Sequence, residues 1–258
     1  MKKSIILITS VLLLSISQIF AQGPDIEQFQ FETEPTQTEK SPYFSLGGGY
    51  TAAFQYLNLD EVNNLAKSYG LDNLSKPMYQ GGFEVFTGIF IVKNLRLGFF
   101  TDGGSSSSSF DSLNLHRELN YQISNIGIIA DYAFVPFKSF AILGGLRIGM
   151  AKSNIDISQT ARDVDWNELP TTTNIADFYS HKLSQNFLDL EPRVNFEYAV
   201  TNFLMFRLNA SYNFSLKDPF GSSNWKYNSI GRVTNVPDKL NQSGFKIQVG
   251  LFVGLMNY

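Results

Sequence analysis

Apolar and polar side chains alternate with a period of two residues in eight long segments of this chain. In residues 186–200, Leu188, Val194 and Phe196 share one face of an extended chain, and Arg193 and Glu197 share the other. Successive side chains of a strand point to opposite faces, so this period indicates strands with one apolar and one polar face. The predicted strands are residues 43–56, 78–92, 94–110, 119–134, 140–153, 186–200, 203–214 and 244–257.

The connections between these segments alternate between short and long. Turns are predicted at 93–94, 135–139 and 201–202, and longer loops at 57–77, 111–118, 154–185 and 215–243. Short turns at one end and long loops at the other are typical of a membrane β-barrel, with periplasmic turns and external loops. Apolar residues at helical spacing predict a short helix over 60–69, ended by Gly70, that caps the barrel mouth. A contact with lipid headgroups or a partner is the alternative for this helix.

The strands are too long for an ordinary soluble sheet. Several span 14 or more residues, whereas soluble strands have a mode of about 5–6. Aromatic residues recur near the strand ends, as in the interfacial girdles of membrane barrels. An open sheet edge would be costly in hydrocarbon, so the first strand must pair with the last. We therefore predict an all-β fold over residues 43–258, an eight-stranded antiparallel up-and-down transmembrane β-barrel. A soluble lipocalin-like barrel or sandwich is the alternative.

The N-terminus has the features of an export signal. Lys2 and Lys3 precede an apolar run over 5–16, and small and polar residues lead to Ala21. This pattern predicts a cleaved signal peptide over residues 1–21, with a retained membrane anchor as the alternative. Residues 22–42 are acidic and rich in Gln, Thr and Pro, which predicts a disordered periplasmic segment. A partner-binding tail is its alternative reading.

Composition excludes several classes of function. Removal of residues 1–21 takes away two lysines and no acid, so the net charge changes from −3 to −5. This balance argues against nucleic acid as a partner. The chain has no Cys, which excludes disulfides, thiolate metal sites and a Cys nucleophile. With only two histidines in addition, we expect no metal site and no cofactor.

At this point the chain resembles the small outer-membrane β-barrel superfamily, the OmpA-like and OmpX-like barrels, with porin-like architecture over 43–258. Residues 19–22, Ile-Phe-Ala-Gln, are similar to export signals of Bacteroidetes-type bacteria. The last strand is similar to the assembly signal of such barrels, which assigns that role to Phe252 and Tyr258. Tyr258 is out of phase with the outward apolar residues of 245–255. The resemblance implies the bacterial outer membrane as location, and its lipid and the barrel-assembly machinery as partners.

The polar faces of the strands carry a balanced set of charges. Five bases and five acids are predicted to face the lumen: Arg96, Arg147, Arg193, Arg207, Lys246, Glu84, Asp131, Asp189, Glu191 and Glu197. Side chains fill the interior of an eight-stranded barrel, and charges there must pair to offset their desolvation. We therefore predict a lumen plugged by paired charges. Interior Gly47, Gly49, Gly82 and Gly88 would leave room for long Arg side chains or for water. A polar pore lined by the same charges and a pair of catalytic carboxylates are the alternatives.

The two histidines offer little basis for catalysis. His116 lies near Ser112 and Glu118, and His181 lies near Asp177 and Ser184. A hydrolase would need a Ser–His pair oriented by an acid, but such neighbours are common in polar loops, so no catalytic residue is predicted. The predicted function is a structural or surface-interaction role, with an extracellular ligand bound through loops 57–77, 154–185 and 215–243. A narrow channel for small solutes or ions and a lipid-modifying enzyme are the alternatives.

Overall fold

The computed structural model describes residues 43–89, 91–112, 115–161, 179–217 and 224–257. The predicted signal peptide over 1–21 and the acidic segment over 22–42 lie outside this range. The long strands are β1 (Phe44–Leu57), β2 (Met78–Gly88), β3 (Leu95–Ser112), β4 (Leu115–Phe137), β5 (Phe140–Ala161), β6 (Tyr179–Ala199), β7 (Leu204–Lys217) and β10 (Gly244–Asn257). The other elements are helix α2 (Asp60–Ser68) and the two-residue strands β8 (Lys226–Tyr227) and β9 (Gly231–Arg232). None of the described helical residues form a helix that is long and apolar enough to cross a membrane.

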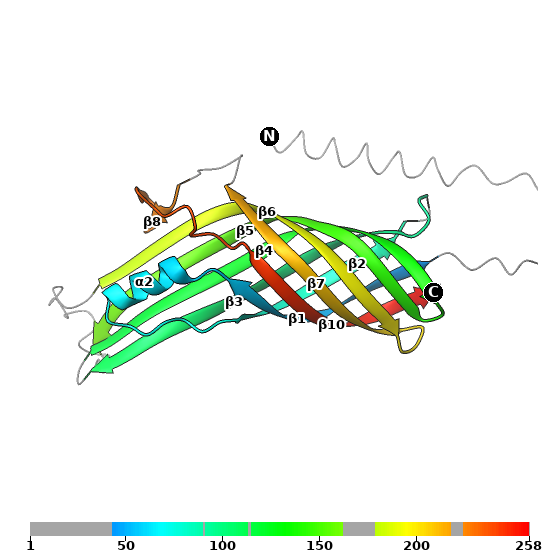
Figure 1. Ribbon diagram of the computed structural model, residues 1–258, viewed down its shortest axis with the longest axis horizontal. Helices are drawn as coiled ribbons and strands as arrows, with labels where there is room; N and C mark the ends of the chain where they lie inside the picture. The colour runs from blue at the N-terminus through cyan, green and yellow to red at the C-terminus, as the bar shows by residue number, and fades with distance from the viewer. Residues whose placement is uncertain (1–42, 90, 113–114, 162–178, 218–223, 258) are drawn as a thin grey trace, which may run out of the picture. The chain divides into compact units, whose positions relative to one another are not determined.

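The eight long strands close into a ring, as predicted (Figure 1). Each pairs antiparallel with its neighbours in the order β5-β4-β3-β2-β1-β10-β7-β6, and a β5–β6 ladder closes the circle. The first strand pairs with the last from Phe44–Asn257 to Leu57–Gly244. The prediction of an eight-stranded antiparallel transmembrane barrel is therefore confirmed.

Three short connections lie at one end of the barrel, called here the turn end. The β4–β5 connection is a two-residue turn at 138–139, in which Ser139 has a φ of 68°. The β2–β3 connection is longer than the two residues predicted, because β2 ends at Gly88 rather than at Val92. Instead, the chain reverses between Gly88 and Leu95, with Asn94 at a φ of 64°. In the third turn, Val200 N donates to Leu204 O at 2.9 Å.

The opposite end, called the loop end, is built mainly by strands that continue past the rest of the barrel. Two predictions were wrong here. Residues 111–112 and 115–118 are strand and not loop, because the β3–β4 ladder continues to Ser112–Leu115. Much of 154–185 is also strand, because the β5–β6 ladder reaches Gln159–Tyr179. In these extensions each strand has one polar face and one apolar face. The ladders can therefore continue, because water solvates the polar face and buried apolar residues cover the other. The rest of that loop, 162–178, lies outside the described residues.

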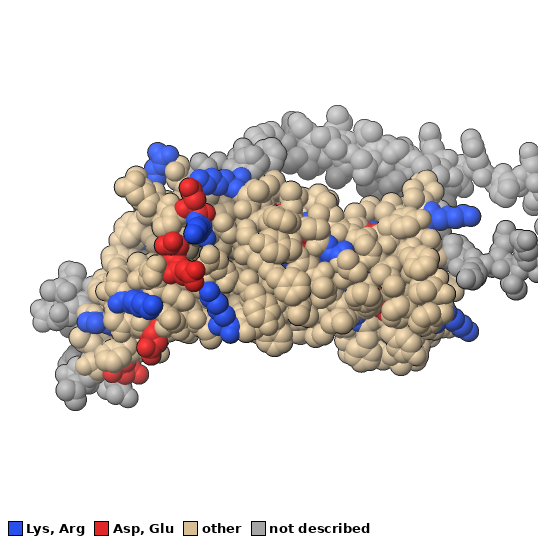
Figure 2. Space-filling model, in the orientation of Figure 1, with Lys and Arg blue, Asp and Glu red and all other residues tan. Residues whose placement is uncertain are grey.

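The outer surface of the barrel has an apolar belt (Figure 2). Charged side chains gather toward the two ends, and the surface between them is largely uncharged. Large apolar residues are exposed there, among them Phe99 and Ile126, each 64% exposed, and Phe206, 54% exposed. An outward apolar band over an inward polar face is the arrangement of a barrel in lipid.

The belt ends where the two faces of the sheet exchange polarity. On β4 the outward side chains change from Ile126 to Ser124, and the inward ones change from Asn125 to Ile123. The outward side chains make the same change between Met150 and Lys152 on β5, and between Leu188 and Asn186 on β6. The outward apolar segment of β5 thus covers residues 140–150, which matches the about 9–11 residues that a tilted strand needs to cross a bilayer. Beyond this level β3–β6 form a sheet outside the membrane, which we call the projecting sheet.

The inward face of the projecting sheet is apolar and covered. We call this cluster the apolar cap. Its buried members are Leu57, Leu59, Val62, Ala66, Leu71, Leu74, Met78, Leu119, Tyr121, Ile123, Ala151, Ile155, Ile157, Phe187 and Trp225. Helix α2 confirms the predicted helix and ends near Gly70, whose φ of 72° suits glycine. Trp225, from the β7–β10 connection, is 6% exposed and packs in the same cluster.

Candidate functional site: the charged barrel interior

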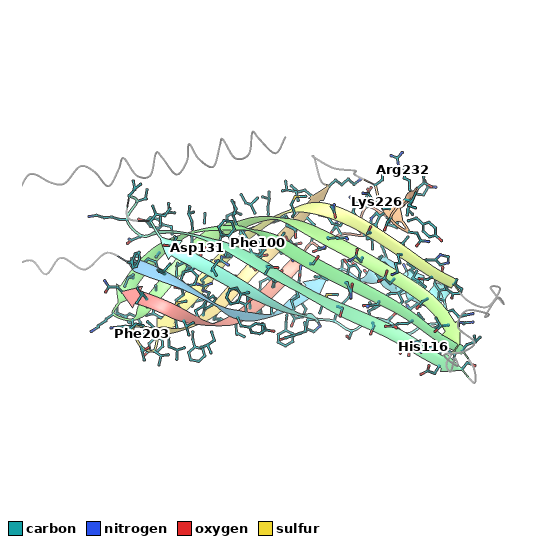
Figure 3. The ribbon with its side chains drawn as sticks, turned by 180° about the vertical axis from the view of Figure 1, so that it is seen from behind. Phe100, His116, Asp131, Phe203, Lys226 and Arg232 are labelled. Carbon is teal, nitrogen blue, oxygen red and sulfur yellow. The ribbon has the colours of Figure 1, made fainter. Side chains whose placement is uncertain are left out.

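The ten charged residues predicted for the lumen all lie inside the barrel. Each is at most 5% exposed: Glu84, Arg96, Asp131, Arg147, Asp189, Glu191, Arg193, Glu197, Arg207 and Lys246. Side chains alternate between the two faces of a strand. Because the apolar residues next to these charges face lipid, the charged side chains point into the barrel. Figure 3 shows Asp131 and Phe100 within the barrel, far from His116 at the loop end. The structure divides these charges into two groups with different geometry.

Six charges nearer the turn end form a closed cycle, called here the six-membered ring. Bases and acids alternate around it in the order Arg96, Asp131, Arg193, Glu84, Arg207 and Glu197. Its six contacts measure 2.6 Å (Arg96–Asp131), 2.7 Å (Asp131–Arg193), 3.0 Å (Arg193–Glu84), 2.6 Å (Glu84–Arg207), 2.7 Å (Arg207–Glu197) and 2.6 Å (Glu197–Arg96). Every member therefore contacts two partners of opposite charge, which is the arrangement that offsets the desolvation of buried ions.

Aromatic groups complete the packing of the six-membered ring. The guanidinium of Arg207 lies 4.0 Å from the centroid of the Phe252 ring, and that of Arg96 lies 4.4 Å from the Phe86 ring. Such contacts favour a cation that has lost its water. Tyr43 covers the side toward the turn end, where its hydroxyl donates to Glu197 Oε2 at 3.1 Å and accepts from Arg96 Nη1 at 3.0 Å.

The second group, the four-membered ring, lies farther toward the loop end. Arg147 and Lys246 each contact both Asp102 and Glu191. Lys246 Nζ is 2.7 Å from Glu191 and 3.5 Å from Asp102, and Arg147 is 3.1 Å from Glu191 and also forms an ion pair with Asp102. Arg147 additionally lies 3.5 Å from the centroid of the Phe100 ring. Asp102 was not among the predicted lumen residues, although it shares the inward parity of Arg96 on β3.

Asp189 lies inside the barrel but apart from both rings. Its carboxylate accepts from Asn213 Nδ2 at 2.7 Å and from Ser215 Oγ at 2.5 Å. No ion pair joins Asp189 to any residue in the described part of the chain. Asn213 also donates to Gln242 O at 3.2 Å, and Gln242 Nε2 donates to Ser153 Oγ at 3.0 Å. A hydrogen-bonded polar layer thus separates the charged rings from the apolar cap.

Interior glycines make room for carboxylates more than for arginines. A Cβ at Gly145 would collide with Asp131 Oδ1, and one at Gly82 would lie 2.6 Å from Asp102 Cβ. Gly47, Gly49, Gly82 and Gly88 lie on the inward face, as predicted, and a Cβ at Gly47 or Gly49 would lie against the backbone of β10. These glycines therefore set how closely the strands and the charged rings approach each other.

Adjacent Gly145 and Gly144 allow a matched test of this packing. We expect Gly145→Ala to destabilise the barrel by about 1–3 kcal/mol, because the added methyl overpacks the six-membered ring. Gly144 faces outward with no atom within 4 Å of its Cβ position, so Gly144→Ala should be neutral or stabilising by up to about 1 kcal/mol. The midpoint of urea unfolding measures both effects, provided that the dependence of the free energy of unfolding on urea concentration is unchanged. Equal midpoints for the two variants would contradict the packing argument.

The predicted assembly residues have different positions. Phe252 is fully buried inside the barrel, where its ring centroid is 5.4 Å from that of Phe86. It therefore packs against the six-membered ring rather than facing lipid. Tyr258 lies outside the described residues. An assembly role for either residue remains a prediction.

The histidines lie at the loop end and contact no serine hydroxyl in the described part of the chain. His116 Nδ1 is 2.7 Å from Asp111 Oδ1, and its Nε2 is 3.7 Å from Glu118 Oε2. The hydrogen bond with Asp111 is the main cause that raises the pKa of His116 above its usual value. His181 Nδ1 instead lies 2.7 Å from the Tyr227 hydroxyl. Of its predicted neighbours, Asp177 lies outside the described residues. No cluster of three or more metal-binding side chains occurs among the described residues.

Comparison with known proteins gives matches among solved structures, all at low sequence identity. No protein-family model matches the sequence, and no curated protein matches it significantly. Among solved structures, the chain is similar to neisserial surface protein A (NspA), with 15% identity, a TM-score of 0.43, and coverage of 81% of this chain and 96% of that one. It is also similar to a major outer membrane protein from Thermus thermophilus (10% identity, TM-score 0.47, 82% and 99% coverage). Another similar structure is that of the outer membrane protein OprG from Pseudomonas aeruginosa (15% identity, TM-score 0.36, 84% and 95% coverage). The closed ring of eight antiparallel strands described above is itself the fold that the predicted resemblance to small outer-membrane β-barrels implies.

Proposed function

We propose that this protein is a closed outer-membrane β-barrel that holds the projecting sheet outside the membrane, in a structural or surface-interaction role. The observation that carries the proposal is the burial of both charged rings. Their side chains are between 0% and 5% exposed. A conducting lumen would leave such groups accessible to water, so a plug is favoured over a narrow channel.

The loop end supports the same conclusion. The apolar cap fills the mouth above the polar layer, and it commits α2 and Trp225 to packing. The predicted ligand loop 57–77 is thereby largely used for closure, which leaves the projecting sheet as the surface for an extracellular partner. One edge of this sheet is covered, since Leu183 on β6 pairs with Tyr227 on β8. The other edge is open beyond Gly104, because β3 pairs there only with β4 among the described residues.

An open strand edge supports a surface-interaction role. Residues 105–109 of β3 are five serines, without the Lys or Pro residues that commonly protect an exposed edge from pairing. An extended peptide can add to such an edge through main-chain hydrogen bonds. This arrangement favours an interaction role over a purely structural one.

Conductance in planar lipid bilayers tests closure. With the full chain inserted, as shown by protection of the barrel from protease, we expect no steady unitary current. The reason is that both charged rings and the apolar cap would have to rearrange before ions could pass. Steady unitary currents would overturn the closed barrel and support the channel. Release of fatty acids from the bilayer lipid would instead support a lipid-modifying enzyme.

A further inference from the structure

The outer surface of the barrel has a distinctive row of side chains at the level where the two faces exchange polarity. Lys152 on β5 lies directly opposite Ser124 on β4 and directly opposite Asn186 on β6. All three face outward, and each carries a hydrogen-bond donor. Neighbouring strands lie about 4.8 Å apart, so the three donors can reach oxygens of one phosphate group.

The next outward-facing row toward the turn end is apolar. In the same registers, Met150 on β5 lies opposite Ile126 on β4 and opposite Leu188 on β6. On these strands, this row is where the lipid-facing belt ends on the side of the loop end. The surface is hollowed where the two rows meet, and the hollow has a volume of about 380 Å³. Its lining includes Thr101, Ser124, Ile126, Met150, Lys152 and Asn186. The hollow is therefore polar on the side away from lipid and apolar on the side toward it.

The charge at this site has no partner of opposite charge among the residues that the structure describes. Lys152 is exposed, and it forms no ion pair with a described residue. Its two cross-strand neighbours are neutral. Lys182, two rows farther from the belt, differs because it lies directly opposite Asp156. A single cation between two neutral donors, at the edge of an apolar surface, is complementary to an anionic group on an apolar chain.

We propose that this hollow binds the phosphate group of an anionic lipid in the leaflet that faces the loop end. The ammonium of Lys152 and the side chains of Ser124 and Asn186 contact the phosphate, and an acyl chain lies along Ile126, Met150 and Leu188. The lipid site requires that the barrel spans a membrane. Which leaflet supplies the lipid depends, in addition, on the proposed outer-membrane function. Lipid binding at this site would fix the depth of the barrel in the bilayer, because the lipid phosphate would be held at one level of the sheet.

The test compares two spin-labelled lipids, phosphatidic acid and phosphatidylcholine, around the full chain in phosphatidylcholine vesicles. The motionally restricted fraction in electron paramagnetic resonance spectra reports their relative association. We expect phosphatidic acid to be preferred about fivefold, which is what about 1 kcal/mol per basic side chain near the surface gives at 25 °C. Lys152→Gln should abolish this preference, and Ser124→Ala with Asn186→Ala should reduce it. Lys182→Gln is the matched control and should leave it unchanged.

Three outcomes of the lipid comparison would overturn the lipid site. These are equal association of both lipids with the unmodified chain, an unchanged preference in Lys152→Gln, and an equal loss in Lys182→Gln, which would indicate diffuse surface charge. Displacement of phosphatidic acid by millimolar inorganic phosphate would show a site for the free anion and would also overturn it. Failure of the proposed function is seen separately, as steady current or as absence of insertion. A closed, inserted barrel without lipid preference would refute only this site.

Discussion

Glu84→Gln should lower the free energy of unfolding by about 3–5 kcal/mol, because it leaves two buried cations without their shared partner. Glu84 contacts Arg193 at 3.0 Å and Arg207 at 2.6 Å, and all three side chains are at most 2% exposed. The change keeps the size of the side chain and removes only its charge. Reversible unfolding in urea, followed in lipid vesicles, measures the loss. Asp72→Asn is the control at an exposed acid, and it should change stability by no more than about 0.5 kcal/mol.

A double variant tests whether the balance of charges in the six-membered ring contributes to the free energy of unfolding, separately from the contacts that each substitution removes. Adding Arg207→Met to Glu84→Gln leaves two bases and two acids in the six-membered ring. We expect the double variant to be less destabilised than the sum of the two single variants, by about 1–3 kcal/mol, since the sites are in contact. Strict additivity would show that the balance of the ring does not stabilise the barrel.

Ala66→Asp should release α2 from the apolar cap while the membrane-spanning barrel stays folded. Ala66 is fully buried against the projecting sheet, and a buried carboxylate without a partner costs several kcal/mol. Trypsin should then cleave after Lys67 at least about tenfold faster, because about 1.4 kcal/mol of local destabilisation already raises the open population tenfold. Mass spectrometry of the products locates the cuts.

Asn64→Asp provides a matched control on the same helix. Asn64 is exposed, so the same added charge should leave the cleavage rate nearly unchanged. Unfolding of the whole barrel in Ala66→Asp would contradict the prediction, because it would mean that cap and barrel form one cooperative unit. Unchanged cleavage in Ala66→Asp would show that α2 does not depend on the cap.

The interior charges illustrate which properties could be predicted. Side chains of a strand alternate strictly, so the inward position of Arg193 or Lys246 follows from the apolar residues beside it in the chain. The pairs could not be predicted in this way. Glu84 and Arg207 are 123 residues apart, and their contact depends on the stagger of every strand between them. For the same reason Asp102, rather than Asp189, completes the four-membered ring.

The loop end shows the other limit of the sequence. The apolar belt was predicted because lipid contact requires one continuous apolar face per strand. Part of the projecting sheet was predicted as loops over 111–118 and 154–185, because alternation weakens and changes phase where lipid ends. There, polar side chains turn outward to water and apolar ones turn inward to α2 and Trp225, segments that are distant in the chain.

Local periodicity was therefore enough to establish the membrane-spanning strands, the closed barrel and which face of each strand is polar, because these follow from the geometry of a single strand in lipid. The tertiary structure alone decided which charges meet, what fills the mouth, and which outward side chains lie side by side at the membrane boundary. These features depend on register between strands and on loops that return to the barrel, and neither leaves a period in the sequence.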